Sequence, residues 1–126
     1  MTKTNALILT SLLALSAAAP LHADDATTKT VGEVYEERAA LEGQQVMVQG
    51  EVVKVNAGIM QRNFIHVQDG SGDVLHETNN LVITSQDVAA VGDSVHVTGT
   101  VVVDHDLGFG YFYPVLVEEA SVTVAE

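Results

Sequence analysis

Cysteine is absent from the 126 residues of this chain, so it forms no disulfide bond and has no thiol nucleophile. No Gly-x-Ser-x-Gly motif occurs, and no Ser/His/Asp set stands out from arbitrary combinations. Segment 58–62 contains a glycine but lacks the Gly-Lys-Ser/Thr ending of a phosphate-binding loop. Carboxylate pairs are common, yet so acidic a chain produces them by chance. We therefore predict that the protein is not an enzyme.

Positive charge is also scarce. The chain has 5 Lys and Arg against 17 Asp and Glu, which gives a formal net charge of −12. Proteins that bind nucleic acids need a basic face that neutralises phosphates. The acidic composition therefore argues against nucleic acid as a partner. It suits solubility and the attraction of cations or cationic partners.

Residues 1–23 have the layout of a secretory signal peptide. Lys3 precedes an uncharged apolar stretch, residues 6–19, and Leu21-His22-Ala23 stands before two aspartates. A membrane span needs about 20 apolar residues, so this stretch is too short to cross a bilayer. We expect cleavage after Ala23, or alternatively after Ala19, and a periplasmic mature protein without a membrane span. The competing interpretation is a buried N-terminal helix.

The rest of the chain comprises a polar leader, residues 24–29, and enough residues for a single domain, 30–126. Thr30 and Glu33 form a capping-box pattern, which predicts a helix that ends at Gly43. Beyond it, apolar and polar residues alternate. This period predicts strands over 46–55, 64–68, 81–84, 94–104 and 111–124, the last broken near 118–119. A helical turn is expected within 85–90.

Lone glycines, Gly50 and Gly99, interrupt the two long strand patterns. They predict bulges that let these strands bend around a small barrel. Five strands in this arrangement favour an all-β fold, a five-stranded OB-fold-like Greek-key barrel with a short N-terminal helix. A β-sandwich is the alternative, although sandwiches usually have about seven strands.

The segment Val48–Gly72 has the sequence VQGEVVKVNAGIMQRNFIHVQDGSG. It resembles a family of small exported bacterial OB-fold proteins related to NrfJ, with its Gly-Ile-Met, Arg-Asn-aromatic-Ile-His and Gln-Asp-Gly-Ser-Gly elements. The stretches LVITSQD, VGDSVHVTGTVVVD and GYFY are similar to the family's continuation, so the likeness covers most of 44–124. Gln61 replaces a second glycine of the family pattern, and His105 replaces a lysine-like residue. The resemblance implies an exported OB-fold, often described as nucleic-acid binding, and little about chemistry.

Segment 58–68 also supplies the candidate site. If Ile65 and Val67 face the core, Phe64 and His66 face outward, because strand side chains alternate. In an OB-fold this outer face, with the flanking strand 1–2 and 4–5 loops, is the usual ligand surface. The candidate residues for a ligand or partner are Met60, Arg62, Asn63, Phe64 and His66.

Methionine and histidine together suit copper(I), and imidazole also suits zinc. The candidate metal ligands are Met60 and His66, with His105 on the opposite loop. Simpler interpretations stand beside this one. His66 can be an ordinary surface histidine, and Met60 can plug the barrel end as a gap-filler. Asp104 and Asp106 around His105 can merely solvate a loop. Asp69–Asp73 is interpreted as a hairpin turn, because it lacks the spacing and closing glutamate of a calcium loop.

Together these observations predict an exported, non-catalytic binding or accessory module. Its ligand would be a transition-metal ion, copper or zinc, or a periplasmic redox partner. One alternative is a protein that binds single-stranded nucleic acid. The other is a structural interaction module whose exposed strand edge pairs with another chain.

Overall fold

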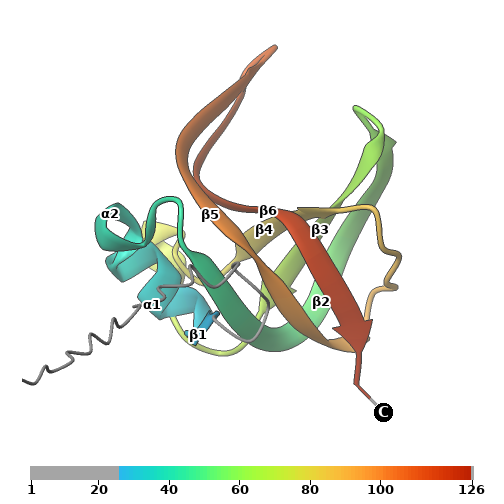
Figure 1. Cartoon of the computed structure of the whole chain (residues 1–126), viewed down its shortest axis with the longest axis horizontal. Coiled ribbons are helices and arrows are strands. Elements are labelled where there is room, and N and C mark those ends of the chain that lie inside the picture. Colours follow the sequence, from blue (N-terminus) through green and yellow to red (C-terminus); the bar gives the residue numbers. More distant parts are fainter. Residues whose placement is uncertain (1–25, 126) are drawn as a thin grey trace, which may run out of the picture.

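Strands make up most of the described part of the chain, as the period-two alternation predicts (Figure 1). The computed structural model describes residues 26–125, and the predicted signal peptide lies outside them. The elements in chain order are β1 (Thr27–Thr28), α1 (Val31–Glu36), α2 (Arg38–Leu41), β2 (Gln45–Ile59), β3 (Arg62–Gln68), the 3₁₀ turn η2 (Val74–His76), β4 (Leu81–Ser85), β5 (Ser94–Gly108) and β6 (Tyr111–Val124). No helix in this range has the length and apolar character needed to cross a membrane.

The five long strands close into a barrel. β2 pairs antiparallel with both β3 and β5, β3 pairs antiparallel with β4, and β5 with β6, while β4 and β6 run parallel. The hydrogen-bonded order β2-β3-β4-β6-β5 therefore returns to β2. This ring confirms the predicted all-β, five-stranded OB-fold-like Greek-key barrel.

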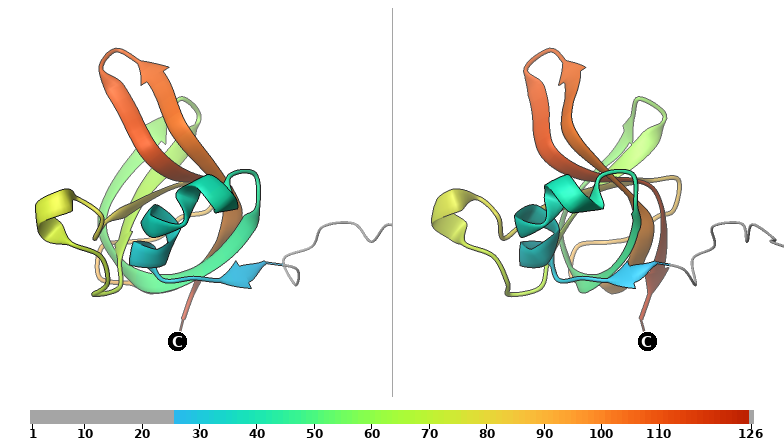
Figure 2. Two further views of the ribbon diagram at one scale, coloured as in Figure 1. Left: turned by 90° about the vertical axis from the view of Figure 1, so that its left-hand side faces the viewer. Right: turned by 60° about the vertical axis from the view of Figure 1, so that its left-hand side comes forward.

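Alternate residues of the strands fill the barrel. Val46 and Val48 of β2, like Ile65 and Val67 of β3, are completely buried. The helices cover one end of this core, where Val31 and Val34 are also completely buried (Figure 2). Each buried side chain of this kind contributes about 1.5–3 kcal/mol relative to an exposed one. The hydrophobic core thus joins the helices and the barrel into one unit.

The two strand glycines have a different role from the one predicted. The bulge in β2 comes at Val53, where the pairing with β3 shifts between Val52 and Lys54, and not at Gly50. A Cβ atom on Gly50 would lie 2.4 Å from Val67 Cγ1 and 2.7 Å from the Gln68 carbonyl oxygen. Gly50 is therefore required because β3 crosses closely over it.

Gly99 lies opposite a bulge and does not form one. The extra residue is in β6, because the pairing shifts between Thr98 and Thr100 while Glu119 has a φ of 52°. β6 is therefore continuous through 118–119, where the sequence predicted a break. A Cβ atom on Gly99 would lie 2.7 Å from Val117 Cγ1, so here too the strands approach closely.

The N-terminal segment differs from its prediction in two places. The polar leader contains β1, which pairs in parallel with Val46 and Met47 of β2. The capping box of Thr30 and Glu33 is confirmed, but the helix is interrupted at Glu37 and continues as the separate α2. Residues 86–90 contain bends and chain without regular secondary structure, so the predicted helical turn is wrong.

The turn after β3 caps α1 from outside the helix. Asp69 Oδ2 accepts the Val31 N–H at 2.9 Å, and Ser71 Oγ accepts the Gly32 N–H at 2.7 Å. Burial alone would raise the pKa of the Asp69 carboxyl, but hydrogen bonds from Ser71 and from the Val31 backbone outweigh it and leave the pKa below its usual value. Asp69–Asp73 is thus a turn that also holds the helix on the barrel.

We expect Asp69→Asn to lower the free energy of unfolding by about 1 kcal/mol at pH 7, because a hydrogen bond to a charged acceptor contributes about that much more than one to a neutral amide oxygen. The folded pKa of Asp69 is depressed, so its charge stabilises the protein above the unfolded pKa of about 3.9. This contribution disappears as the pH falls through the folded pKa. Urea unfolding at pH 7 and pH 3 measures the difference, with Glu36→Gln on the same helix as the control. A deficit of equal size at both pH values would contradict the role of the Asp69 charge.

Candidate functional site

Two hairpins rise from the barrel as separate arms (Figure 1). β2 leaves β5 after Glu51 and continues with β3 alone, which forms the β2–β3 arm, residues 53–63. The ends of β5 and β6 form the β5–β6 arm, residues 103–114. The predicted strands stopped at 55 and 104, because the arm sequences lack regular alternation. Both arms extend on the same side of the barrel (Figures 1 and 2).

Side-chain amides brace the β2–β3 arm. Its tip residues Met60 and Gln61 have φ values of 53° and 67°, the left-handed pair of a two-residue hairpin turn. Asn63 Oδ1 accepts the Gly58 N–H at 3.1 Å, and Asn63 Nδ2 donates to the Asp87 carbonyl at 2.8 Å. Asn63, one of the candidate ligand residues, thus ties the arm to the loop after β4.

The β5–β6 arm twists near its middle, so that the set of β5 residues that faces the outer cluster changes there. Val102 and Leu107 both pack against the same buried cluster, although an odd separation puts residues of a regular strand on opposite faces. Asp104, with a φ of 53°, lies between them, and Pro114 lies on the neighbouring strand. This twist brings Leu107 over the outer face of the barrel.

A cleft of about 270 Å³ lies between the arms, and we call it the arm cleft. Its lining carries no charged group and consists of Asn56, Ile59, Met60, Phe64, Leu107, Tyr111 and Tyr113. Burial, helped by the neighbouring Tyr111, raises the pKa of the Tyr113 hydroxyl above its usual value, so this side chain adds no charge to the cleft. The arm cleft is therefore an uncharged, largely apolar site on a strongly acidic protein.

Phe64 forms the floor of the arm cleft. It faces the outer side of β3, as strand parity predicts, but the expectation of an accessible side chain is wrong because it is only 3% exposed. It packs in a second buried cluster with Val82 and Leu116, outside the barrel core. Its ring lies 6.2 Å from that of Tyr113, between centroids. The β5–β6 arm covers it, a contact between distant segments that no local pattern predicts.

Arg62 lies beside Phe64, and its positive charge is partly neutralised by Glu118. Its guanidinium carbon is 5.5 Å from the centroid of the Phe64 ring, within cation–π distance. Its Nη1 is 3.3 Å from Glu118 Oε2. Arg62 Nε and the hydroxyl of the nearby Thr84 are buried without a hydrogen-bond partner. Arg62 thus makes a cation–π contact with the Phe64 ring, and Glu118 offsets its charge.

His66 lines a separate hollow that it shares with Tyr113 and Asn80. Asn80 Nδ2 lies 3.1 Å from His66 Nδ1, and with the amide in this orientation the contact fits the tautomer that carries its proton on Nε2. Burial, and next the charge of Lys54, lower the pKa of His66, so the ring is neutral at physiological pH. A neutral imidazole is competent to bind a metal.

The predicted metal ligands line different parts of the surface. Met60 borders the arm cleft, His66 the other hollow, and His105 is a half-buried residue paired with Tyr113 on the β5–β6 arm. In residues 26–125, no three His, Asp or Glu side chains are grouped closely enough to hold an ion. A copper or zinc site at Met60, His66 and His105 stays a prediction without geometric support.

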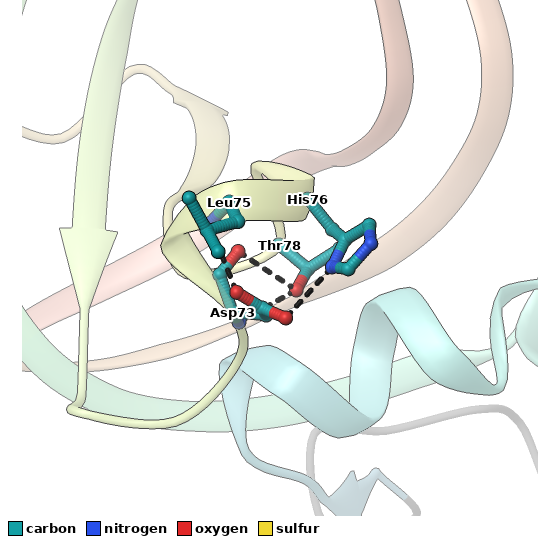
Figure 3. A network of polar contacts seen from close by, with 4 residues as sticks. All are labelled: Asp73, Leu75, His76 and Thr78. Carbon is teal, nitrogen blue, oxygen red and sulfur yellow. Dashed lines mark hydrogen bonds and ion pairs between the residues drawn. The ribbon is translucent and has the colours of Figure 1, made fainter.

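A polar network around η2 was not anticipated from the sequence (Figure 3). Asp73 accepts the Leu75 N–H at 2.9 Å and lies 2.7 Å from His76 Nδ1. The hydrogen bonds from His76, and next from the Leu75 backbone, lower the pKa of Asp73. Thr78 Oγ1 accepts the Asp73 N–H at 2.8 Å, so the hydroxyl is used within the turn. These contacts cap η2, and the Asp-x-x-His spacing was the signal that could have revealed them.

Comparison with known proteins gives a fold likeness and no family. No protein family model matches the chain, and no curated protein matches it. Among solved structures it is similar to a putative aspartyl-tRNA synthetase from Leishmania major Friedlin, with a TM-score of 0.52 and 16% identity. The match covers 86% of this chain and 24% of that one, so the chain spans about a quarter of its length. At this identity the likeness shows the fold alone.

Proposed function

We propose that this chain is an exported, non-catalytic binding module that receives one bulky apolar side chain of a periplasmic protein partner in the arm cleft. The observation that carries the proposal is the uncharged, aromatic lining of that cleft in a chain of formal charge −12. Protein interfaces are depleted of charge at their centre and enriched in Tyr, Phe and Met. The lining of the arm cleft has this composition.

The size of the cleft supports a side chain as the occupant. Pockets for small molecules usually measure about 300–1,000 Å³, and the arm cleft measures about 270 Å³. Apolar residues at its margin are exposed, including Ile59 at 45%, Met60 at 49% and Tyr111 at 57%. A partner that covered them would remove apolar surface from water and gain binding energy.

Export enters the proposal through the N-terminal sequence and through the resemblance to the NrfJ-related proteins. The most specific part of that resemblance, 58–72, supplies the tip of the β2–β3 arm, the cleft floor and the turn that caps α1. Single-stranded nucleic acid is the weaker candidate. OB-folds do bind it on this surface, but Lys54 and Arg62 are the only cations of the two arms, and Glu118 offsets Arg62.

The proposal predicts position-specific cross-linking in the periplasm. A photo-reactive phenylalanine analogue in place of Tyr111 should give a discrete cross-linked protein in an osmotic-shock fraction. The same analogue in place of Leu75, which is 88% exposed on η2, is the matched control and should give none. Adding Met60→Asp should reduce the Tyr111 yield about tenfold, because the partner's apolar group would then face an unpaired charge.

Two outcomes would contradict the proposal. Equal cross-linking from Tyr111 and Leu75 would show that the arm cleft is not selective. Cross-linking of Tyr111 to nucleic acid, with no protein adduct, would favour the OB-fold oligonucleotide function instead.

A further inference from the structure

The charges around the arm cleft define the kind of partner it accepts. The β5–β6 arm carries Asp104 and Asp106, both exposed, and contains no Lys or Arg. A neighbouring hollow, which Met60 also lines, contains Asp87 and Glu119. Arg62 also lines this hollow, and Asp87 Oδ2 accepts the Val122 N–H at 2.8 Å. The β5–β6 arm and the hollow thus carry four carboxylates, none of which lines the arm cleft itself.

Few cations oppose this negative charge. The β2–β3 arm contributes Lys54 and Arg62, and Arg62 is already paired with Glu118. Lys54 lies across from His66 in the β2–β3 pairing, next to the other hollow. Carboxylates therefore outnumber cations on the two arms and in the neighbouring hollow, in keeping with the formal charge of −12 on the whole chain. A charge excess of this kind steers oppositely charged partners and rejects partners of like charge.

From this arrangement we infer that the partner segment presents a bulky apolar side chain flanked by basic residues. The apolar side chain enters the arm cleft above Phe64, and the basic residues face the carboxylates of the β5–β6 arm and of the neighbouring hollow. This inference rests on the proposed function, because it assigns the chemistry of the partner at the same cleft. It adds a charge requirement that a purely apolar cleft would not have.

Three short peptides, blocked at both ends, separate the two requirements. Lys-Phe-Lys carries the anchor and the basic flanks, Glu-Phe-Glu reverses the flanks, and Lys-Ala-Lys removes the anchor. Each is titrated into the ¹⁵N-labelled protein, and dissociation constants are taken from the amide shifts of Asn56, Met60 and Tyr111. At 20 mM NaCl we expect Lys-Phe-Lys to bind about tenfold more tightly than Glu-Phe-Glu, and at 500 mM within about twofold, since salt screens exposed charges. Lys-Ala-Lys should leave these three amides unshifted.

Two double variants test which carboxylates cause the preference for basic flanking residues. Asp104→Asn with Asp106→Asn keeps the oxygen that accepts the Gly108 N–H and tolerates the left-handed backbone at 104. Glu36→Gln with Glu42→Gln removes the same amount of charge from the helical end of the barrel. We expect the arm variant to lose most of the preference for Lys-Phe-Lys and the helix variant to keep it.

The outcomes separate the inference from the proposed function. Equal binding of Lys-Phe-Lys and Glu-Phe-Glu at low salt would overturn the basic-flank requirement and leave the cleft as an apolar binding site. Equal loss of preference in the two double variants would overturn the assignment to the arm carboxylates. Failure of both phenylalanine peptides to shift the cleft amides would overturn the inference and count against the proposed function as well.

Discussion

Gly72→Ala is expected to destabilise the protein far more than Gly70→Ala, although both glycines have a left-handed backbone. Their φ values are +84° and +87°. An alanine in this conformation costs about 1–2 kcal/mol, and both variants pay this cost. A Cβ atom on Gly72 would also lie 2.0 Å from the Thr78 carbonyl oxygen and 2.8 Å from Asn79 Cα, whereas a Cβ on Gly70 meets nothing within 4 Å.

The contact with Thr78 cannot be relieved by moving a flexible side chain, because it is made with backbone. Overpacking of this kind adds about 1–3 kcal/mol. Each kcal/mol lowers the Tm of a domain of this size by about 4–8 °C. Thermal unfolding followed by circular dichroism should therefore place Gly72→Ala about 4–24 °C below Gly70→Ala. Equal Tm values would show that segment 72–79 moves away at little cost.

The clash would be transmitted to the helical end of the barrel. A Cβ atom on Gly32 of α1 would lie 2.7 Å from Gly72 N, so α1 is packed directly on this turn. Displacement of Gly72 should weaken the contacts from Asp69 and Ser71 that cap α1. Faster hydrogen exchange at the α1 amides than in Gly70→Ala is the corresponding local signal.

Phe64→Ala is the second large effect we expect, with a loss of about 3–5 kcal/mol in the free energy of unfolding, as for other buried phenylalanines. The side chain is only 3% exposed and holds the β5–β6 arm over the outer face through Tyr113, Val82 and Leu116. The matched control is Phe109→Ala at the tip of that arm. Phe109 is 93% exposed, so its removal should change stability by less than about 0.5 kcal/mol.

Urea unfolding measures both variants. A small cost for Phe64→Ala, comparable with that for Phe109→Ala, would mean that the second cluster contributes little and that the arm is not held over the barrel. Phe64→Leu supplies a further check, because it keeps most of the apolar volume. It should recover most of the lost stability, since swaps that nearly conserve volume usually cost less than about 1.5 kcal/mol.

The site could be predicted from the sequence only in part. Strand parity correctly put Phe64 and His66 on the outer face of β3, because alternation is a local property of an extended chain. It did not indicate which of them is covered. Phe64 is buried by Tyr113, almost 50 positions later in the chain, while His66 borders a different hollow with Asn80. The grouping of Met60 with Tyr111 and Leu107 in the arm cleft likewise depends on two hairpins that are distant in sequence.

Local sequence patterns were enough to predict the class of fold and most of the barrel strands. Alternation, the Thr30–Glu33 capping box and the turn glycines act over a few residues, and they indicated the barrel portions of the five strands and the start of α1, but neither β1 nor the full length of the arms. Tertiary structure decided the features that depend on contacts between distant segments. Gly50 is required by the approach of Val67, α1 is capped by Asp69 and Ser71, and the arm cleft exists because both arms extend on one side of the barrel. Local patterns record conformational preference and the direction of side chains, whereas burial depends on what packs against them once the barrel has closed.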